Sequence, residues 1–275
     1  MDKLRFGSAG IPLSTSKKGT NEGIKRVREL ELDAMEMEFV RAVYIKKENA
    51  PEFKKTAIDK DVVLTCHAPY FINLNSEDKQ KFYASINYIK NSAIITSLCG
   101  GYSVCFHAGY YQKMDPKKVY ERIKEALKII TKDVKEIDKN IWIRPETTGK
   151  ISQFGTIHEI LNLSLEFDNV MPCIDWSHLH SWSNGKYNTT EEFREILNLV
   201  EKRLGRRGLD NVHFHCQGVE YTEKGERWHL NLKESDLKYE DLVKVWKEFK
   251  IKGVVIAESP NVEEDALLLK KLYYK

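Results

Sequence analysis

The sequence predicts an α/β protein whose 275 residues form one closed (β/α)8 TIM barrel, a single domain over residues 1–275. Two observations predict this fold. Eight short runs of β-favouring residues recur along the chain, and longer amphipathic segments with helical periodicity separate them. In order, the strand runs are KLRFGS, AMEMEF, DVVLTC, YSVCF, NIWIRP, NVMPCI, NVHFHC and KGVVIA. Strand–helix units repeated eight times imply a parallel sheet, which at this length closes most economically into a barrel with right-handed crossovers.

Two of the intervening segments illustrate the helical pattern. Residues 115–137 place Val119, Ile123 and Leu127 on one face while Lys and Glu occupy the other, and an Asp-Pro pair is a plausible helix start. Residues 189–204 open with threonines suited to capping and with two early glutamates. A doubly wound open sheet is the alternative, but the first strand is not followed by the Gly-rich phosphate fingerprint typical of that fold.

Composition and charge describe a globular protein without a membrane segment. Hydrophobic residues make up 41% of the chain and charged residues 31%, and no apolar run approaches the roughly 18 residues of a membrane helix. The N-terminus MDKLRFGSAG lacks the apolar stretch of a secretion signal, so we expect a soluble, cytoplasmic protein with no membrane partner. The net charge of +3 is too small to indicate nucleic-acid binding by itself.

The five cysteines are expected to be reduced. They are Cys66, Cys99, Cys105, Cys173 and Cys216. Their number is odd, no CxxC pair is present, and several lie within apolar strand-like runs. We therefore expect buried thiols of the core rather than disulfides.

Metal-ligand residue types recur where the predicted strands end. The carboxyl ends of all barrel strands surround one mouth, where the active sites of this fold lie. Six consecutive strands, from the third to the eighth, end in His, Asp or Glu. In chain order the candidates are His67, His107, Glu146, Asp175 with His178, His213 or His215, and Glu258, and His229 follows the seventh strand. Side-chain alternation does not separate His213 from His215, but His215 lies nearer the carboxyl end of its strand and is the preferred candidate.

Such a rim is costly to bury unless cations lie within it. It gathers imidazoles and carboxylates without a compensating ring of Lys or Arg, and buried charged groups need partners. Bound divalent metals are the simplest partners, and mixed His and carboxylate ligands without thiolates suit zinc or manganese. A bridging carboxylate such as Glu146 would fit a cluster of more than one ion. The two remaining histidines, His158 and His180, are interpreted as ordinary surface or loop residues.

Six segments, taken together in their order and spacing, carry a resemblance to a known family. They are HAPYFINL, FHAGYY, ETTG, CIDWSH, HFHCQG and IAESP. From about the third strand to the last, and more weakly over the first, the chain resembles the endonuclease IV family of apurinic/apyrimidinic endonucleases. These are zinc enzymes with a xylose isomerase-like barrel. The resemblance therefore implies two to three zinc ions, with manganese as the alternative metal.

In the implied arrangement, Glu146 is the catalytic residue, because it bridges two ions and orients the nucleophile. The other implied ligands are His67 and His107 for one ion, Asp175, His215 and Glu258 for the second, and His178 and His229 for a third.

The resemblance fails at one ligand of the third ion and along the second strand. The family has an Asp two residues before its last histidine, whereas here that position is Arg227, preceded by Glu226. Glu226 would replace the Asp through a shifted loop, or else Arg227 would itself meet a phosphate of the DNA. In the second strand, Glu36 and Glu38 would add carboxylates at the mouth, which a metal or the DNA-binding candidate Arg41 must offset.

The substrate implied by the resemblance is double-stranded DNA with abasic sites, which the family grips by inserting side chains into the base stack. Tyr70 and Phe71 lie at the matching loop positions, and an exposed aromatic pair suits stacking on bases. Ile72 and Leu74 are instead expected to anchor this loop to the core.

The resemblance predicts a metal-dependent apurinic/apyrimidinic endonuclease of base excision repair, expected to be a monomer. The ions would lower the pKa of an attacking water, and the bond cut would lie 5′ to the abasic sugar, leaving a 3′-hydroxyl and a 5′-deoxyribose phosphate. One alternative is a sugar isomerase or epimerase of the same barrel superfamily, using Glu146, Asp175, His215 and Glu258. That alternative leaves the other histidines of the mouth unexplained. A further alternative is a non-enzymatic relative that binds only DNA or a partner.

Overall fold

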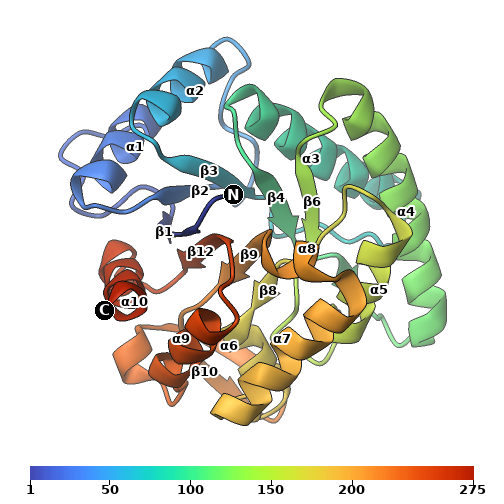
Figure 1. Cartoon of the computed structure of the whole chain (residues 1–275). Coiled ribbons are helices and arrows are strands. Elements are labelled where there is room, and N and C mark those ends of the chain that lie inside the picture. Colours follow the sequence, from blue (N-terminus) through green and yellow to red (C-terminus); the bar gives the residue numbers. More distant parts are fainter.

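The computed structural model describes residues 1–275 and contains the predicted barrel, with strands at the centre and helices around them (Figure 1). Eight parallel strands are hydrogen-bonded in the order β6-β4-β3-β2-β1-β12-β9-β8. They are β1 (Leu4–Ala9), β2 (Ala34–Glu38), β3 (Val63–His67), β4 (Ser103–Phe106), β6 (Trp142–Pro145), β8 (Ile174–Asp175), β9 (Val212–His215) and β12 (Gly253–Ala257). Each overlaps one of the eight predicted runs, so the strand predictions and the fold class are confirmed.

The sheet closes between its two end strands, β6 and β8. The backbone N–H of Ile143 donates to the carbonyl oxygen of Asn169 at 3.0 Å, and that of Cys173 donates to Pro145 at 3.1 Å. A parallel bridge between Glu146 and Cys173 continues this ladder. Because the sheet is closed, the carboxyl ends of all its strands surround one opening.

Helices cover the outside of the sheet. They are α1 (Thr20–Glu29), α2 (Ala50–Asp59), α3 (Lys79–Leu98), α4 (Pro116–Ile137), α5 (Ile157–Glu166), α6 (Trp176–Trp182), α7 (Thr190–Leu204), α8 (Arg206–Leu209), α9 (Tyr239–Glu248) and α10 (Glu263–Tyr274), with a short 3-10 turn at Leu232–Glu234. The two predicted helices are confirmed as α4, which Asp115 caps, and α7, which begins with a capping box of Thr189 and Glu192. None of these helices combines the length and the apolar character needed to cross a membrane.

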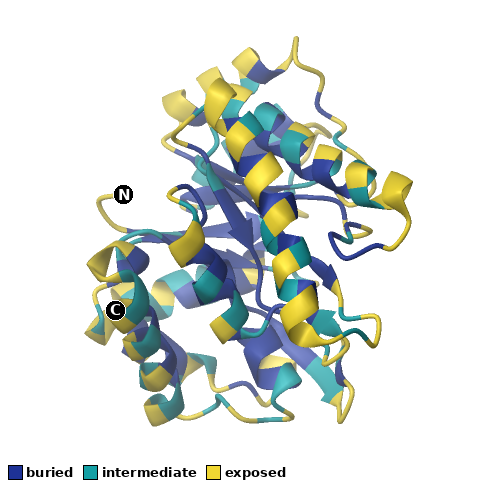
Figure 2. Cartoon of the chain, turned by 90° about the vertical axis from the view of Figure 1, so that its right-hand side faces the viewer, coloured by how far each residue is buried: buried dark blue, intermediate teal, exposed yellow.

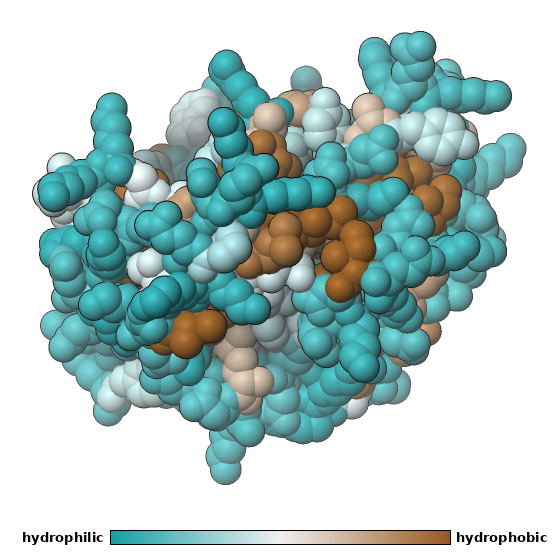
Figure 3. Space-filling view, turned by 90° about the horizontal axis from the view of Figure 1, so that it is seen from above, coloured by the Kyte–Doolittle hydropathy of each residue, from teal (hydrophilic) through white to brown (hydrophobic).

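One main hydrophobic core lies between the strands and the helices (Figure 2). The strands are almost wholly buried, whereas the helices alternate buried and exposed positions. Edge-to-face contacts of Trp176 with Phe193 and Phe214, at ring-centroid distances of 5.7 and 5.4 Å, join α6 to α7 and β9. All five cysteines are free and buried, as predicted. The surface seen from above is mostly hydrophilic, with a broken band of apolar side chains across it (Figure 3).

Two antiparallel strand pairs follow the barrel strands and carry residues of the mouth. They are β5 (Gly109–Tyr110) with β7 (Gln153–Phe154), and β10 (Gly218–Thr222) with β11 (Gly225–Leu230). The loop between β6 and β7 contacts the second pair, since Lys150 bridges to Gly225 and the N–H of Glu226 donates to the Gly149 oxygen at 2.8 Å. Gly225 has a φ of +93°, and a Cβ there would lie 2.1 Å from that oxygen. Only glycine fits this approach, which holds β11 against the loop that follows β6.

Candidate metal centre

Glu146 lies at the centre of the barrel mouth, one residue beyond β6. It is fully buried, and four imidazoles surround its carboxylate. Oε2 lies 3.1 Å from His67 Nε2 and 3.6 Å from His107 Nε2. Oε1 lies 3.1 Å from His215 Nδ1 and 3.3 Å from His178 Nδ1. Oε2 thus faces the Nε2 atoms of His67 and His107, and Oε1 faces Nδ1 of His215, so the two oxygens point at different candidate ligand nitrogens, as in a carboxylate that bridges two cations.

Asp175, His215 and Glu258 adjoin Glu146 on one side of the mouth. One donor atom from each of these four side chains lies within 4.8 Å of the other three. The side-chain amide of Gln217 donates to Asp175 Oδ2 at 2.8 Å and holds this carboxylate in place. One imidazole with three carboxylates, one of them bridging, fits a zinc or manganese ion.

His213, the alternative to His215, lies on the same side of β9 but further from the carboxyl end of the strand. Its ring contacts Ser103 Oγ at 2.9 Å and Glu36 Oε2 at 3.0 Å. His215 instead contacts Glu146, which places it with the carboxylates of the mouth. The geometry therefore favours His215 as the ligand.

Two thiols also approach the histidines of β9. Cys105 and Cys173 each place a sulfur within 4.8 Å of donor atoms of His213 and His215. Burial raises the pKa of the Cys105 thiol well above its usual value, so this sulfur stays protonated and is a poor ligand. The imidazoles and carboxylates of the mouth are therefore better candidate ligands than this thiol.

A third group lies between α6 and β11. His178 Nε2 is 3.4 Å from Glu226 Oε2, and His229 Nε2 is 3.5 Å from Glu226 Oε1. One donor atom from each of the three side chains lies within 4.8 Å of the others. Since His178 also contacts Glu146, this group adjoins the other two.

A β-bulge explains how Glu226 reaches this position. In a regular strand, residues three apart face opposite sides, so Glu226 and His229 would diverge. In β11, however, the pairing shifts, because Glu220 pairs with Trp228 whereas the next residue, Tyr221, pairs with Glu226. The extra residue in the bulge, at position 227, returns Glu226 to the side of His229. Of the alternatives that the sequence left open at this position, the bulge matches the one in which Glu226 replaces the Asp through a shifted backbone.

Backbone carbonyls orient three of the histidines. His67, His178 and His229 each direct Nδ1 at a carbonyl oxygen, at 2.7, 2.9 and 3.1 Å respectively. A carbonyl oxygen only accepts, so Nδ1 carries the hydrogen and Nε2 is left to face the mouth. Histidines that bind metals show this pattern, because the outer hydrogen bond fixes the tautomer and the ring orientation. His107 differs, since its buried Nδ1 has no hydrogen-bond partner.

His215 is oriented by a carboxylate, Glu36, which the sequence placed at the mouth. That placement was wrong, because Glu36 is fully buried below the mouth, with its oxygens 2.9 Å from His215 Nε2 and 3.0 Å from His213 Nε2. The contact leaves His215 Nδ1 to face Glu146. Glu38 lies beside the mouth, where its Oε2 accepts a hydrogen bond from the hydroxyl of Tyr70 at 3.2 Å, and burial and the charge of Glu36 raise its pKa to about 8.

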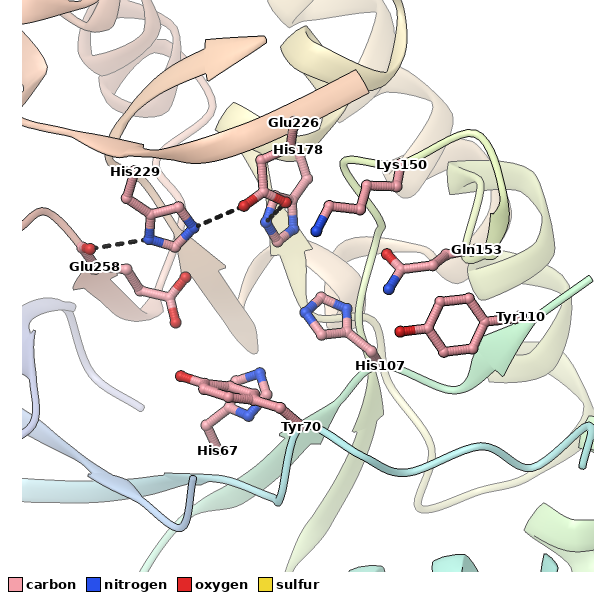
Figure 4. Close-up of a pocket in the computed structure, with 10 residues that line it drawn as sticks. All are labelled: His67, Tyr70, His107, Tyr110, Lys150, Gln153, His178, Glu226, His229 and Glu258. Carbon is pink, nitrogen blue, oxygen red and sulfur yellow. Dashed lines mark hydrogen bonds and ion pairs between the residues drawn. The ribbon is translucent and has the colours of Figure 1, made fainter. Parts of the chain in front are cut away.

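The mouth opens into a cavity of about 430 Å³ (Figure 4). Its lining includes the predicted His67, Tyr70, His107, His178, Glu226, His229 and Glu258. It also includes Tyr110, Lys150 and Gln153, which the sequence did not single out. Lys150 lies only four positions after Glu146, in the loop that follows the fifth barrel strand, and loops at that end of a barrel carry functional residues.

The chain matches the family model of the xylose isomerase-like TIM barrel over residues 24–272. The chain belongs to this family. An uncharacterized protein of Methanocaldococcus jannaschii is 41% identical over 270 residues, which cover 98% of this chain and 97% of that protein. A probable endonuclease 4 of Aster yellows witches'-broom phytoplasma is 25% identical over 186 residues, which cover 66% of this chain and 62% of the relative. The expected resemblance to endonuclease IV is thus confirmed as a distant relationship.

Solved structures of the xylose isomerase-like fold include proteins of both candidate kinds. Endonuclease IV from Thermus thermophilus is similar with a TM-score of 0.72 and 19% identity, covering 97% of this chain and 97% of that one. A D-tagatose 3-epimerase-like protein is similar with a TM-score of 0.72 and 19% identity, covering 97% of this chain and 96% of that one. The shared fold therefore does not choose between an endonuclease and an epimerase.

The charges of the mouth shift its proton equilibria. Burial alone would lower the pKa of His67 and His229, but hydrogen bonds to Glu146 and Glu226 outweigh it and raise these pKa values to about 10 and about 9. Burial would raise the pKa of Glu226, but the bond from His229 and the charge of His178 lower it to about 2. Without an ion, protons on His67 and His229 therefore balance the carboxylates at neutral pH.

The predicted DNA-contacting loop follows β3. Tyr70 and Phe71 are 48% and 51% exposed, and the Tyr70 ring lies edge-on to His67 with 4.9 Å between ring centroids. Ile72 and Leu74 are buried, which confirms that they anchor this loop. The loop thus presents Tyr70 beside His67, whereas the ring of Phe71 lies edge-on to Tyr88 of α3, with 4.9 Å between ring centroids.

The two predicted arginines lie outside the cavity. Arg41 is exposed and forms no ion pair with Glu36 or Glu38, so it does not compensate their negative charge as expected. At Glu36, His213 and His215 are the side chains that face the carboxylate instead. Arg227 is exposed, and its guanidinium lies 4.3 Å from the ring centroid of the neighbouring Trp228.

One of the two histidines interpreted as surface residues is buried. His180 is fully buried in α6, where Nε2 lies 2.9 Å from Asp236 Oδ1 and Nδ1 lies 2.8 Å from the Lys186 carbonyl oxygen. The interpretation as a surface or loop residue was wrong for His180, because α6 directs this side chain at the segment that follows α6, which contains Lys186, and at the segment before α9, which contains Asp236. His158 is exposed on α5, as expected.

We expect Glu36→Gln to weaken zinc binding about 10- to 100-fold, because the amide replaces the charged group that orients His215. Competition with a chromogenic chelator measures the affinity, and Glu223→Gln on an exposed turn is the control. Unchanged zinc affinity in a folded Glu36→Gln protein would contradict the role of Glu36.

Zinc uptake at pH 7 is expected to release protons, because His67 and His229 carry protons that ligand nitrogens must lose. Protons occupy these groups below about pH 9, so the apparent zinc affinity should fall as the pH decreases from that value. Calorimetry in two buffers with different ionisation enthalpies counts the released protons. Uptake without proton release would exclude both histidines as ligands.

Proposed function

We propose that this protein is a metal-dependent endonuclease that hydrolyses the phosphodiester bond 5′ to abasic sites in double-stranded DNA. It would use two to three zinc ions, or manganese, and leave a 3′-hydroxyl and a 5′-deoxyribose phosphate. One observation carries the proposal, namely three adjoining donor groups in one mouth. Glu146 belongs both to the group with Asp175, His215 and Glu258 and to a group with His107 and His178, and His178 in turn belongs to the group with Glu226 and His229. We further propose that residues 1–275 work as one domain and as a monomer.

The number of inward imidazoles favours this function over sugar isomerisation. The group of Glu146, Asp175, His215 and Glu258 would suffice for an isomerase or epimerase that polarises a ketose with one ion. It leaves His67, His107, His178 and His229 without a role. These side chains line the same cavity, and three of them have Nε2 held towards it by a backbone carbonyl. Such a set supports a cluster of ions, which suits phosphodiester hydrolysis.

Each side chain of the candidate site would have a distinct role in this reaction. When bound, divalent ions lower the pKa of water and stabilise negative charge on phosphate oxygens. Glu146 would span two of the donor groups with its two oxygens and so fix their separation. Asp175, held by Gln217, and His215, held by Glu36, would keep the second group rigid. Tyr70 and Phe71 would stack on exposed bases next to the abasic site.

The epimerase remains the second candidate function. It is favoured by the four-residue group and by the similarity to the D-tagatose 3-epimerase-like protein. The two candidates differ in substrate charge and size, so one pair of assays separates them.

Purified protein with added zinc or manganese is expected to incise a duplex that bears a tetrahydrofuran abasic analogue, on its 5′ side. Chelation should abolish incision, and Glu146→Ala should reduce it by about 100-fold or more, because two of the three donor groups lose the carboxylate that they share. Glu201→Ala, on the exposed side of α7, is the control. Ketose epimerisation by the wild-type protein without any incision would overturn the proposal in favour of the epimerase.

A further inference from the structure

The cavity has a second wall, opposite His67 and Glu258, that contains none of the candidate metal ligands (Figure 4). It consists of Tyr110, Lys150 and Gln153, which we call the donor wall. In Figure 4 the ends of all three side chains point into the cavity. Each of them ends in a group that donates hydrogen bonds.

Backbone contacts hold the donor wall in place. Tyr110 and Gln153 are direct cross-strand partners in the pair β5 and β7. The N–H of Gln153 donates to the Lys150 carbonyl oxygen at 3.0 Å, which closes a turn between them. Lys150 also bridges to Gly225 of β11, the strand that carries Glu226. The wall is therefore fixed relative to the candidate metal ligands.

The donors of this wall have no protein acceptor. Gln153 Oε1 accepts a hydrogen bond from Thr148 Oγ at 2.6 Å, which fixes the orientation of the amide. The NH₂ group of Gln153 then has no acceptor within the protein. Neither Nζ of Lys150 nor the hydroxyl of Tyr110 forms a hydrogen bond or ion pair with another side chain. Three neighbouring donors are thus available to a ligand in the cavity.

The charge balance indicates what this ligand is. Lys150 is the one Lys or Arg among the lining residues, whose carboxylates are Glu226 and Glu258. An ammonium, an amide and a hydroxyl together match an anionic group with several acceptor oxygens. Nζ of Lys150 has no direct ion-pair partner, and a neutral sugar would leave it without one, whereas a phosphate would both pair with it and face the metal ligands across the cavity.

We propose that Tyr110, Lys150 and Gln153 bind the non-bridging oxygens of a substrate phosphate and so position this phosphate next to the candidate metal centre. The inference rests on the proposed function for its substrate, a DNA phosphodiester. Lys150 is then a substrate-binding residue that contributes charge. In an epimerase, by contrast, the same lysine would serve as an acid or base that transfers a proton.

Calorimetric titration of the zinc-loaded protein with inorganic phosphate measures the phosphate affinity and so tests the donor wall directly. We expect Lys150→Ala and Gln153→Ala to weaken phosphate binding, by about tenfold or more for the lysine, because a charge-assisted hydrogen bond is lost. Lys150→Arg should retain most of the affinity, since it keeps the charge. Lys128→Ala, on the exposed side of α4, is the matched control.

Kinetics on the abasic-analogue duplex give the second readout. Lys150→Ala should raise KM more than it lowers kcat, and Lys150→Arg should remain active. Equal phosphate affinity in the wild type, Lys150→Ala and Lys128→Ala would overturn the inference. So would a Lys150→Arg protein that binds phosphate but has lost turnover, because that result assigns proton transfer to the lysine.

The two proposals fail in different ways. If the wild-type protein binds phosphate through Lys150 but does not incise DNA, the donor wall stands and the endonuclease does not. If the protein incises DNA and Lys150→Ala is unchanged in both assays, the endonuclease stands and the donor wall does not.

Discussion

The structure of the mouth depends on one constraint: ionisable groups buried at the carboxyl ends of the strands must find their charge partners within the cluster itself. Glu146 meets it by directing its two oxygens at two different pairs of histidines. The outer nitrogens of most of these histidines are in turn held by carbonyl oxygens or by Glu36. An imidazole–carboxylate network of this kind would release protons on binding divalent cations.

Much of the candidate site was predictable because it follows from strand periodicity. Eight β-favouring runs separated by helical segments imply a closed parallel barrel, and closure brings together strand ends that are distant in sequence. His67, His107, Glu146 and Glu258 could therefore be assigned to one mouth before any contact was known. The choice of His215 over His213 also needed only depth along a strand.

The remaining features depend on contacts between elements, which a local pattern does not contain. The bulge in β11 that brings Glu226 to His229 arises from the register of β11 on β10 and from the close approach of Gly225 to Gly149. Glu36 lies two residues before Glu38 in β2, so the depth criterion that separates His213 from His215 also places Glu36 below the mouth. What the local pattern does not contain is its contact with both histidines of β9. The donor wall was missed because β5 and β7 are two residues long and produce no periodic signal.

The central claim is that this mouth is a cage for several divalent cations, and anomalous diffraction at the zinc absorption edge tests it most directly. In crystals grown with zinc, the account predicts peaks within about 2.0–2.3 Å of ligand atoms of Glu146, of the group containing Asp175 and His215, and of the group containing His178 and Glu226. A well-ordered mouth with the same side-chain positions and no anomalous peak among them would contradict the account.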